Sequence, residues 1–187
     1  MNVSTNDLKN GMTLELDGDL WQVLGFQHVK PGKGGAFVRT KLRNLKTSNV
    51  LERTFRADEK VGLAIVERKE MQYLYDDGSS FVFMDPDSYE QVHVPYEVIG
   101  SARDYLVESA TPLVAMHEGG AIGIELAASV VLEVTKTDPG VKGDRVSGAM
   151  KPATLQTGLT VQVPLFVDEG DKVKVDTRSG EYITREQ

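Results

Sequence analysis

A lysine between glycines is the residue of this chain best placed to act on a charged partner. Lys33 lies in the run Pro31–Gly35, with Gly32 and Gly34 on either side. Glycines permit a tight loop at little steric cost, so we expect the loop to project and its amine to reach solvent. An ammonium on a thin loop can approach phosphate or ribose oxygens in a crevice that a whole domain cannot enter. The pattern therefore points to binding of a polyanion.

The segment around this lysine carries no acidic residue. No Asp or Glu occurs between Asp19 and Glu52, although the chain has a formal net charge of -7. Its cations create a local positive field that attracts phosphate, which favours nucleic acid as the partner. Three of them alternate along an expected strand and so form a basic ridge on one face. The cations are Lys30, Lys33, Arg39, Lys41, Arg43 and Lys46, and the ridge is Arg39, Lys41 and Arg43.

Other phosphate-binding and metal-binding patterns are missing. A P-loop needs a glycine six positions before the lysine and Ser or Thr after it, but these positions hold Gln27 and Gly34. The three histidines are scattered without metal-ligand spacing. The chain has no Cys, which excludes disulfides and thiolate zinc sites and fits a reducing compartment. We therefore expect no metal and no bound cofactor.

Catalytic constellations are weak as well. Asp76 and Asp77, and further along Asp85 and Asp87, lie at expected turns, where carboxylates usually accept hydrogen bonds from backbone amides. We expect no enzyme, and a hydrolase with an unrecognised site is the alternative from another class. Turnover of a small ester or phosphate, abolished by one carboxylate substitution, would distinguish that alternative.

Most of the chain is expected to form short strands. Segments rich in Val, Leu, Phe and Tyr recur roughly every 8 to 12 residues between turn signals, which is typical of small barrels or sandwiches. One helix is expected from Tyr96 to Glu108, with Ile99, Ala102 and Leu106 on one stripe. The expected strands are 20–29, 37–45, 71–75, 81–84, 129–135, 160–167 and 172–175.

Four aromatic residues in the middle of the chain alternate along two of these strands. They could stack nucleic-acid bases, but alternate positions on a strand more often fill a core, and we expect the core role. The four residues are Tyr73, Tyr75, Phe81 and Phe83.

Charge differs between three parts of the chain. Net charges are +3 up to Gly62, -9 from there to Leu126, and -1 in the remainder. Only the first part can face a polyanion comfortably, and we expect the middle part to be solvated or to face a basic protein surface. We expect three small barrels with boundaries at 1–62, 63–126 and 127–187. The start lacks the features of a secretion signal and no stretch approaches the roughly 20 apolar residues of a membrane helix, so we expect a cytoplasmic protein.

Motifs in all three parts match one family. The matching motifs are Val29–Arg39, Glu52–Phe55, Tyr73–Tyr75, Asp77–Gly78, Phe83–Asp85, Lys151–Gly170 and Val175–Tyr182. On these motifs the chain resembles bacterial translation elongation factor P over its whole length. The archaeal and eukaryotic initiation factor 5A type fits less well, since those chains end before a third barrel.

The resemblance implies an all-β fold. It predicts an SH3-like or KOW-like barrel followed by two OB-fold barrels, in an L-shaped arrangement similar to tRNA. It also implies a monomeric, non-enzymatic elongation factor that binds the ribosome between the P and E sites. Such a factor stimulates peptide bond formation at consecutive prolines by positioning peptidyl-tRNA. An elongation factor P-like paralogue with the same architecture is the alternative.

The resemblance further implies roles for individual residues. Lys33 matches the loop-tip residue that many members extend by modification, so a lysine-modifying enzyme is an expected partner, although the sequence does not give the modification. Contacts with tRNA and ribosomal RNA are expected from the hairpin, and contacts with tRNA and the exit-site message from the last domain. The hairpin residues are Lys30, Pro31, Gly32, Gly34, Gly35, Arg39, Lys41 and Arg43, and the others are Gly143, Asp144, Arg145, Tyr182 and Arg185.

The roles of Arg145 and of the pair Tyr182 and Arg185 have alternatives. The family usually has Thr where this chain has Arg145, so its guanidinium could bind phosphate instead of reading the codon. Tyr182 and Arg185 could also be ordinary residues of a barrel surface.

Overall fold

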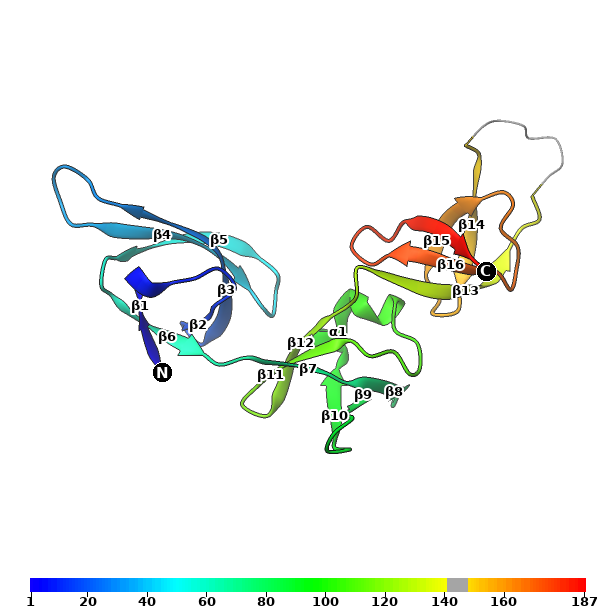
Figure 1. The fold of residues 1–187 in the computed structure, drawn as a ribbon, viewed down its shortest axis with the longest axis horizontal. Helices are drawn as coiled ribbons and strands as arrows, with labels where there is room; N and C mark the ends of the chain where they lie inside the picture. Colours follow the sequence, from blue (N-terminus) through cyan, green and yellow to red (C-terminus); the bar gives the residue numbers. More distant parts are fainter. Residues whose placement is uncertain (141–147) are drawn as a thin grey trace. The chain divides into compact units, whose positions relative to one another are not determined.

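The computed structural model describes residues 1–140 and 148–187 (Figure 1). These residues form antiparallel strands in four sheets, with little helix. The predicted all-β fold of several domains is confirmed. The chain forms two compact units, of which the first comprises residues 1–69 and 114–123 and the second residues 70–113 and 124–187. The predicted domain boundaries and the L-shaped arrangement stay predictions.

The first unit is built on a six-stranded sheet. Its order is β1-β6-β2-β3-β4-β5. Leu14, Val23, Val38, Leu42 and Phe55 are buried in its core. A smaller sheet has the order β12-β11-β7. The strands are β1 (Asn2–Ser4), β2 (Thr13–Leu16), β3 (Asp19–Val29), β4 (Phe37–Asn44), β5 (Val50–Arg56), β6 (Lys60–Ala64), β7 (Glu67–Glu70), β11 (Leu113–His117) and β12 (Gly120–Glu125), with a short 3-10 helix at Thr5–Asp7.

The long hairpin of strands β3 and β4 carries the glycine-flanked lysine. Its strands pair in register from Trp21 opposite Asn44 to Val29 opposite Phe37, with a bulge between Val23 and Gly25. Figure 1 draws it in blue, projecting beyond the other strands of its sheet. Along β4, buried and exposed residues alternate. The expected strand alternation is therefore confirmed, with a basic ridge outside and core residues inside.

The second unit begins with a three-stranded sheet. Strands β8 (Gln72–Asp76), β9 (Ser80–Met84) and β10 (Gln91–Pro95) lie in the order β10-β9-β8. Tyr73, Phe81 and Phe83 are buried, as predicted, but Tyr75 is 45% exposed, so its predicted core position is wrong. The physical reason is a bulge between Tyr73 and Tyr75, which breaks the alternation and places Tyr75 opposite Val82.

The single helix predicted from Tyr96 to Glu108 is also wrong. An α-helix, α1, covers only Tyr96–Ile99, and a 3-10 helix, η2, follows at Gly100–Asp104. Gly100 adopts φ 53 and ψ -135, which an α-helix cannot continue through. Ile99, Ala102 and Leu106 are nevertheless all buried, so the expected apolar stripe is present without a continuous helix.

The remaining sheet closes the second unit. Its order is β15-β14-β13-β16-β17, around a core that includes Leu132, Val163 and Val173. Tyr105, which follows η2, packs into this same core, and the hydroxyl of Thr157 donates a hydrogen bond of 2.6 Å to the Asp104 carbonyl. The strands are β13 (Ser129–Thr137), β14 (Met150–Leu155), β15 (Thr160–Pro164), β16 (Lys172–Asp176) and β17 (Tyr182–Glu186).

Candidate nucleic-acid interface

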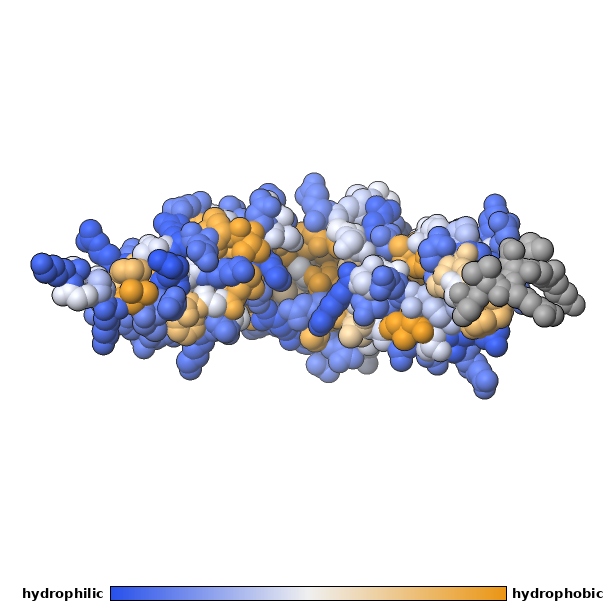
Figure 2. Space-filling view, turned by 90° about the horizontal axis from the view of Figure 1, so that it is seen from above, coloured by the Kyte–Doolittle hydropathy of each residue, from blue (hydrophilic) through white to orange (hydrophobic). Residues whose placement is uncertain are grey.

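The hairpin tip is exposed, as its glycines predict. Every residue from Lys30 to Gly35 is solvent-exposed. The Lys33 side chain makes no hydrogen bond or ion pair with any residue in 1–140 or 148–187. Its ammonium therefore remains available to a partner. At the left end of Figure 2, where the tip lies, the surface is hydrophilic.

Only one of the tip glycines has a backbone that demands glycine. Gly34 adopts φ +108, which L side chains rarely adopt. A Cβ added to Gly32 or Gly35 would meet nothing within 4 Å, and neither residue is in the left-handed region. Position 35 can therefore hold a residue with a side chain without distorting the loop, whereas the backbone at position 34 requires glycine.

The basic ridge lies on the outward face of β4. Arg39, Lys41 and Arg43 are exposed and face Thr54, Glu52 and Val50 of β5. Within the described part of the chain, none of the three cations forms an ion pair, even with Glu52 opposite Lys41. Unpaired cations retain their full attraction for an external anion, because no internal partner has to be displaced first. The ridge is thus brought together on one face and is suited to contact a phosphate backbone.

The opposite face of the hairpin carries two aromatic side chains that the sequence reading did not single out. Phe26 and His28 lie opposite Thr40 and Val38, and their ring centroids are 5.5 Å apart at 82°. Both are exposed, whereas Thr40 and Val38 are fully buried. Period-two alternation places both rings on the buried face of β4, so the sequence pattern alone predicts burial for them.

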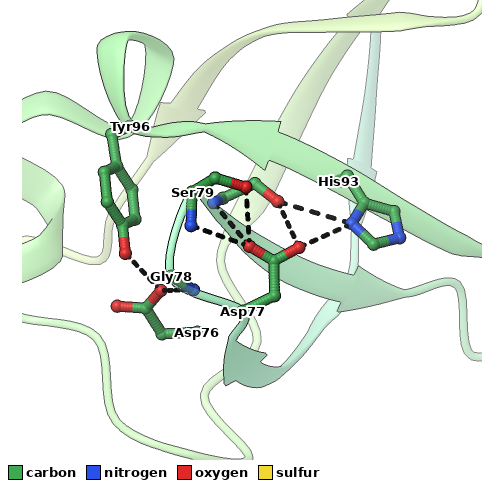
Figure 3. Close-up of polar contacts among 7 residues, drawn as sticks. Asp76, Asp77, Gly78, Ser79, His93 and Tyr96 are labelled. Carbon is green, nitrogen blue, oxygen red and sulfur yellow. Dashed lines mark hydrogen bonds and ion pairs between the residues drawn. The ribbon is translucent and has the colours of Figure 1, made fainter.

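The acidic turn of the second unit is a structural feature, as predicted. The Asp77 carboxylate accepts hydrogen bonds from the backbone amides of Ser79 and Ser80 and from both hydroxyls (Figure 3). These bonds, with the Ser79 amide first, hold the pKa of Asp77 well below its usual range. Asp76 likewise accepts from the Gly78 amide and from the Tyr96 hydroxyl.

This turn does not form a catalytic relay. His93 Nδ1 lies 3.1 Å from Asp77 Oδ2 and 3.4 Å from Ser80 Oγ. The carboxylate and the hydroxyl share one ring nitrogen, whereas a relay needs them at opposite nitrogens. The described residues also contain no group of three or more His, Asp or Glu that could hold a metal ion.

The residues predicted to face RNA in the last domain are differently placed. Tyr182 is half-buried against the barrel core, and the Arg185 guanidinium lies 5.1 Å from the centroid of the Phe166 ring. Arg185 also lies 3.4 Å from Asp171. Their contact with RNA stays a prediction. Gly143, Asp144 and Arg145 lie outside the described residues.

Family models match nearly the whole chain in three consecutive pieces. The elongation factor P KOW-like domain matches residues 4–61, the elongation factor P OB domain residues 66–124, and the elongation factor P C-terminal domain residues 130–185. A protein called elongation factor P from Frankia casuarinae is 59% identical over 182 residues, which are 97% of each chain. The chain belongs to the elongation factor P family. A second elongation factor P, from Maridesulfovibrio salexigens, is 57% identical over 99% of this chain and all of the other.

Solved structures agree with this family. An initiation factor 5A from Methanococcus jannaschii matches 66% of this chain and 91% of its own, with 25% identity and a TM-score of 0.56. Elongation factor P proteins are translation elongation factors and not a family of known enzymes, which agrees with the predicted non-enzymatic role. No helix among the described residues is long and apolar enough to cross a membrane.

Proposed function

We propose that the protein binds the ribosome between the P and E sites and stimulates peptide bond formation at stalling sequences such as consecutive prolines. It does so by holding peptidyl-tRNA in place. The single observation that carries the proposal is the exposed Lys33, which is unpaired within the described residues, on a projecting hairpin. Membership of the elongation factor P family supplies the translational context.

Positioning is the form of catalysis that this hairpin supports. Proline is conformationally constrained both as the peptidyl donor and as the aminoacyl acceptor in peptide bond formation. The nascent chain and the attacking nitrogen therefore align poorly. Holding the CCA end in a reactive geometry lowers the barrier without any bond chemistry by the factor. A tenfold gain in rate needs only about 1.4 kcal/mol, which a few charge-assisted contacts supply. In this proposal Lys33, bare or extended by a modifying enzyme, points at the CCA end.

The basic ridge and the tip backbone supply the affinity. Arg39, Lys41 and Arg43 contact phosphates of tRNA or ribosomal RNA, so this part of binding weakens with salt and reads no sequence. Lys30 and the exposed backbone from Pro31 to Gly35 add contacts beside the tip. In the last domain, the Arg185 guanidinium lies against Phe166 and Asp171 and reaches RNA only with its remaining donors.

A reconstituted translation system tests the proposal. One messenger encodes consecutive prolines and a matched messenger has alanines in their place. The wild-type protein should speed synthesis of the proline product and leave the alanine product unchanged. Lys33→Ala should lose most of this gain while its melting temperature stays unchanged, because an exposed tip contributes no core packing.

Lys46→Ala is the matched control, because Lys46 is exposed in the same acid-free segment but lies in the β4–β5 turn instead of at the tip. It should keep the gain. Mass spectrometry of the native peptide spanning Lys33 shows which form of the side chain enters the assay. If no form of the wild-type protein relieves stalling, the proposal fails and the elongation factor P-like paralogue is favoured.

A further inference from the structure

We propose that Phe26 and His28 form a stacking platform for an unpaired RNA base, on the hairpin face opposite the basic ridge. The inference rests on the proposed function, because it takes RNA to be the partner of the hairpin. It goes further by assigning two residues and by specifying single-stranded nucleotides as what they bind.

The strand geometry places the two rings side by side. They are two residues apart on β3, so they share a face, and their cross-strand neighbours Thr40 and Val38 face the same way. The ring centroids are 5.5 Å apart in an edge-to-face arrangement, so one ring supports the other. The bulge between Val23 and Gly25 directly precedes Phe26, and bulges of this kind redirect the side chains that follow.

Phe26 is unusual among the phenylalanines of this chain. Phe55, Phe81 and Phe83 are buried in cores, whereas Phe26 is 37% exposed. Phe166 is exposed too, but a guanidinium already lies over its ring. Among the described residues, the ring contact recorded for Phe26 is with His28. Phe26 therefore exposes aromatic surface to solvent, and exposed aromatic side chains are where bases stack.

The positive charge of the hairpin favours RNA as the partner that binds this surface. Apart from Asp19 at the start of β3, the hairpin lies within the acid-free segment from Leu20 to Leu51, so a basic protein surface would be repelled. Lys30 lies two residues beyond His28, roughly 7 Å along an extended chain. Aromatic rings beside cations are the combination that binds single-stranded nucleic acid, because the rings stack bases while the cations follow the backbone.

Stacking and phosphate attraction give separable signatures. Stacking requires an unpaired base, whereas attraction to phosphate acts on single strands and duplexes alike. Loss of one stacked base weakens binding by roughly 5- to 150-fold. It should leave the dependence of the affinity on salt unchanged, since no phosphate contact is removed.

The experiment measures binding of the full chain to a short single-stranded RNA that carries 2-aminopurine, whose fluorescence falls when it stacks on an aromatic ring. The wild-type protein should bind it at low salt and quench the probe. The double variant Phe26→Leu/His28→Gln should bind at least fivefold more weakly and lose the quench. The same variant should bind a duplex RNA of equal length with unchanged affinity and unchanged salt slope.

Tyr89→Leu is the matched control, because Tyr89 is 72% exposed but lies outside the acid-free segment. It should keep both affinity and quench. Thermal unfolding checks the double variant, and Leu at position 26 keeps an apolar side chain beside buried Thr40.

Three results would overturn the platform: no quench with wild-type protein, an unchanged affinity in the double variant, or an equal loss on single strand and duplex. Each of them is compatible with a wild-type protein that relieves proline stalling. The stalling assay therefore tests the proposed function separately.

Discussion

The β3–β4 hairpin and the β8–β9 turn both concentrate like charges at the end of a hairpin, but they use them differently. At the acidic turn, Asp76 and Asp77 accept hydrogen bonds from the amides of Gly78, Ser79 and Ser80. At the basic hairpin, Lys33 and the ridge have no ion-pair partner in the described part of the chain. One set of charges stabilises its own turn, and the other remains free for a partner.

The chemistry of the two side chains explains the difference. The short side chain of Asp reaches the backbone amides of its own turn, so its carboxylate finds its hydrogen-bond donors locally. A lysine or arginine on a strand has only donors, and its long side chain extends away from the backbone, so it is neutralised only where an acid forms an ion pair with it. The two hairpins therefore differ in whether their charges are already hydrogen-bonded within the protein. Neutralising the free charges of the basic hairpin should weaken binding, whereas neutralising the hydrogen-bonded charges of the acidic turn should lower stability.

Neutralising the ridge should give the largest effect, and that effect should be on binding. In Arg39→Gln/Lys41→Gln/Arg43→Gln, loss of three phosphate contacts should weaken RNA binding about a hundredfold near 0.15 M salt. The slope of log affinity against log salt should become about 2 to 3 units less steep. Fluorescence titration at several salt concentrations measures both quantities.

The folded state of this triple variant should be as stable as that of the wild type, since the three side chains are exposed and unpaired within the described residues. Lys46→Gln, in the same segment, provides the control for a general loss of charge. If the triple variant bound RNA with the wild-type salt slope, the ridge would not be the contact surface.

Neutralising the acidic turn should instead lower stability. Backbone amides hold the pKa of Asp77 below the ordinary value of 3.8, so its ionised form stabilises the folded state. This contribution is fully present above about pH 3.8 and is lost as the pH falls through the lower folded-state pKa. Asp77→Asn should therefore lower the melting temperature at pH 7, and the difference from wild type should shrink as the pH falls below 3.8.

RNA binding by Asp77→Asn should not change at pH 7. Glu97→Gln, an exposed acid at the start of α1, is the control for loss of one negative charge from the same part of the chain. A constant gap between the wild-type and Asp77→Asn melting temperatures down to low pH would show that the carboxylate is not the stabilising group.

Much of the hairpin could be predicted because its signals are local. The alternation of polar and apolar residues predicted which face of β4 is exposed and which is buried, and the glycines around Lys33 predicted an exposed loop. The same kind of reasoning was wrong where one residue changed the backbone. Gly100, with its positive φ, ended the helix expected from Tyr96 to Glu108, and the bulge after Tyr73 turned Tyr75 to solvent. Pro164 ends β15, short of the strand expected to reach Val167.

The aromatic face of the hairpin depends on information that the sequence does not carry locally. Phe26 lies on the part of β3 beyond its pairing with β2, which ends at Gln22, and where that pairing ends depends on the register of the whole sheet. The contacts of Arg185 were hidden for a similar reason, since Phe166 and Asp171 lie 19 and 14 residues away. Lys33 and its neighbours needed no such information, since exposure there follows from the loop itself.

The smallest effect is expected at Tyr75, an exposed aromatic residue in acidic surroundings. Tyr75→Ser should change the free energy of unfolding by no more than about 0.5 kcal/mol, because its ring is not part of a core. It should also leave single-stranded RNA affinity unchanged, since an aromatic ring without cations beside it does not attract a polyanion. Urea denaturation and the 2-aminopurine assay measure the two quantities. A loss of RNA affinity here similar to that of the hairpin variants would mean that aromatic exposure alone, without the positive field of the hairpin, decides where RNA binds.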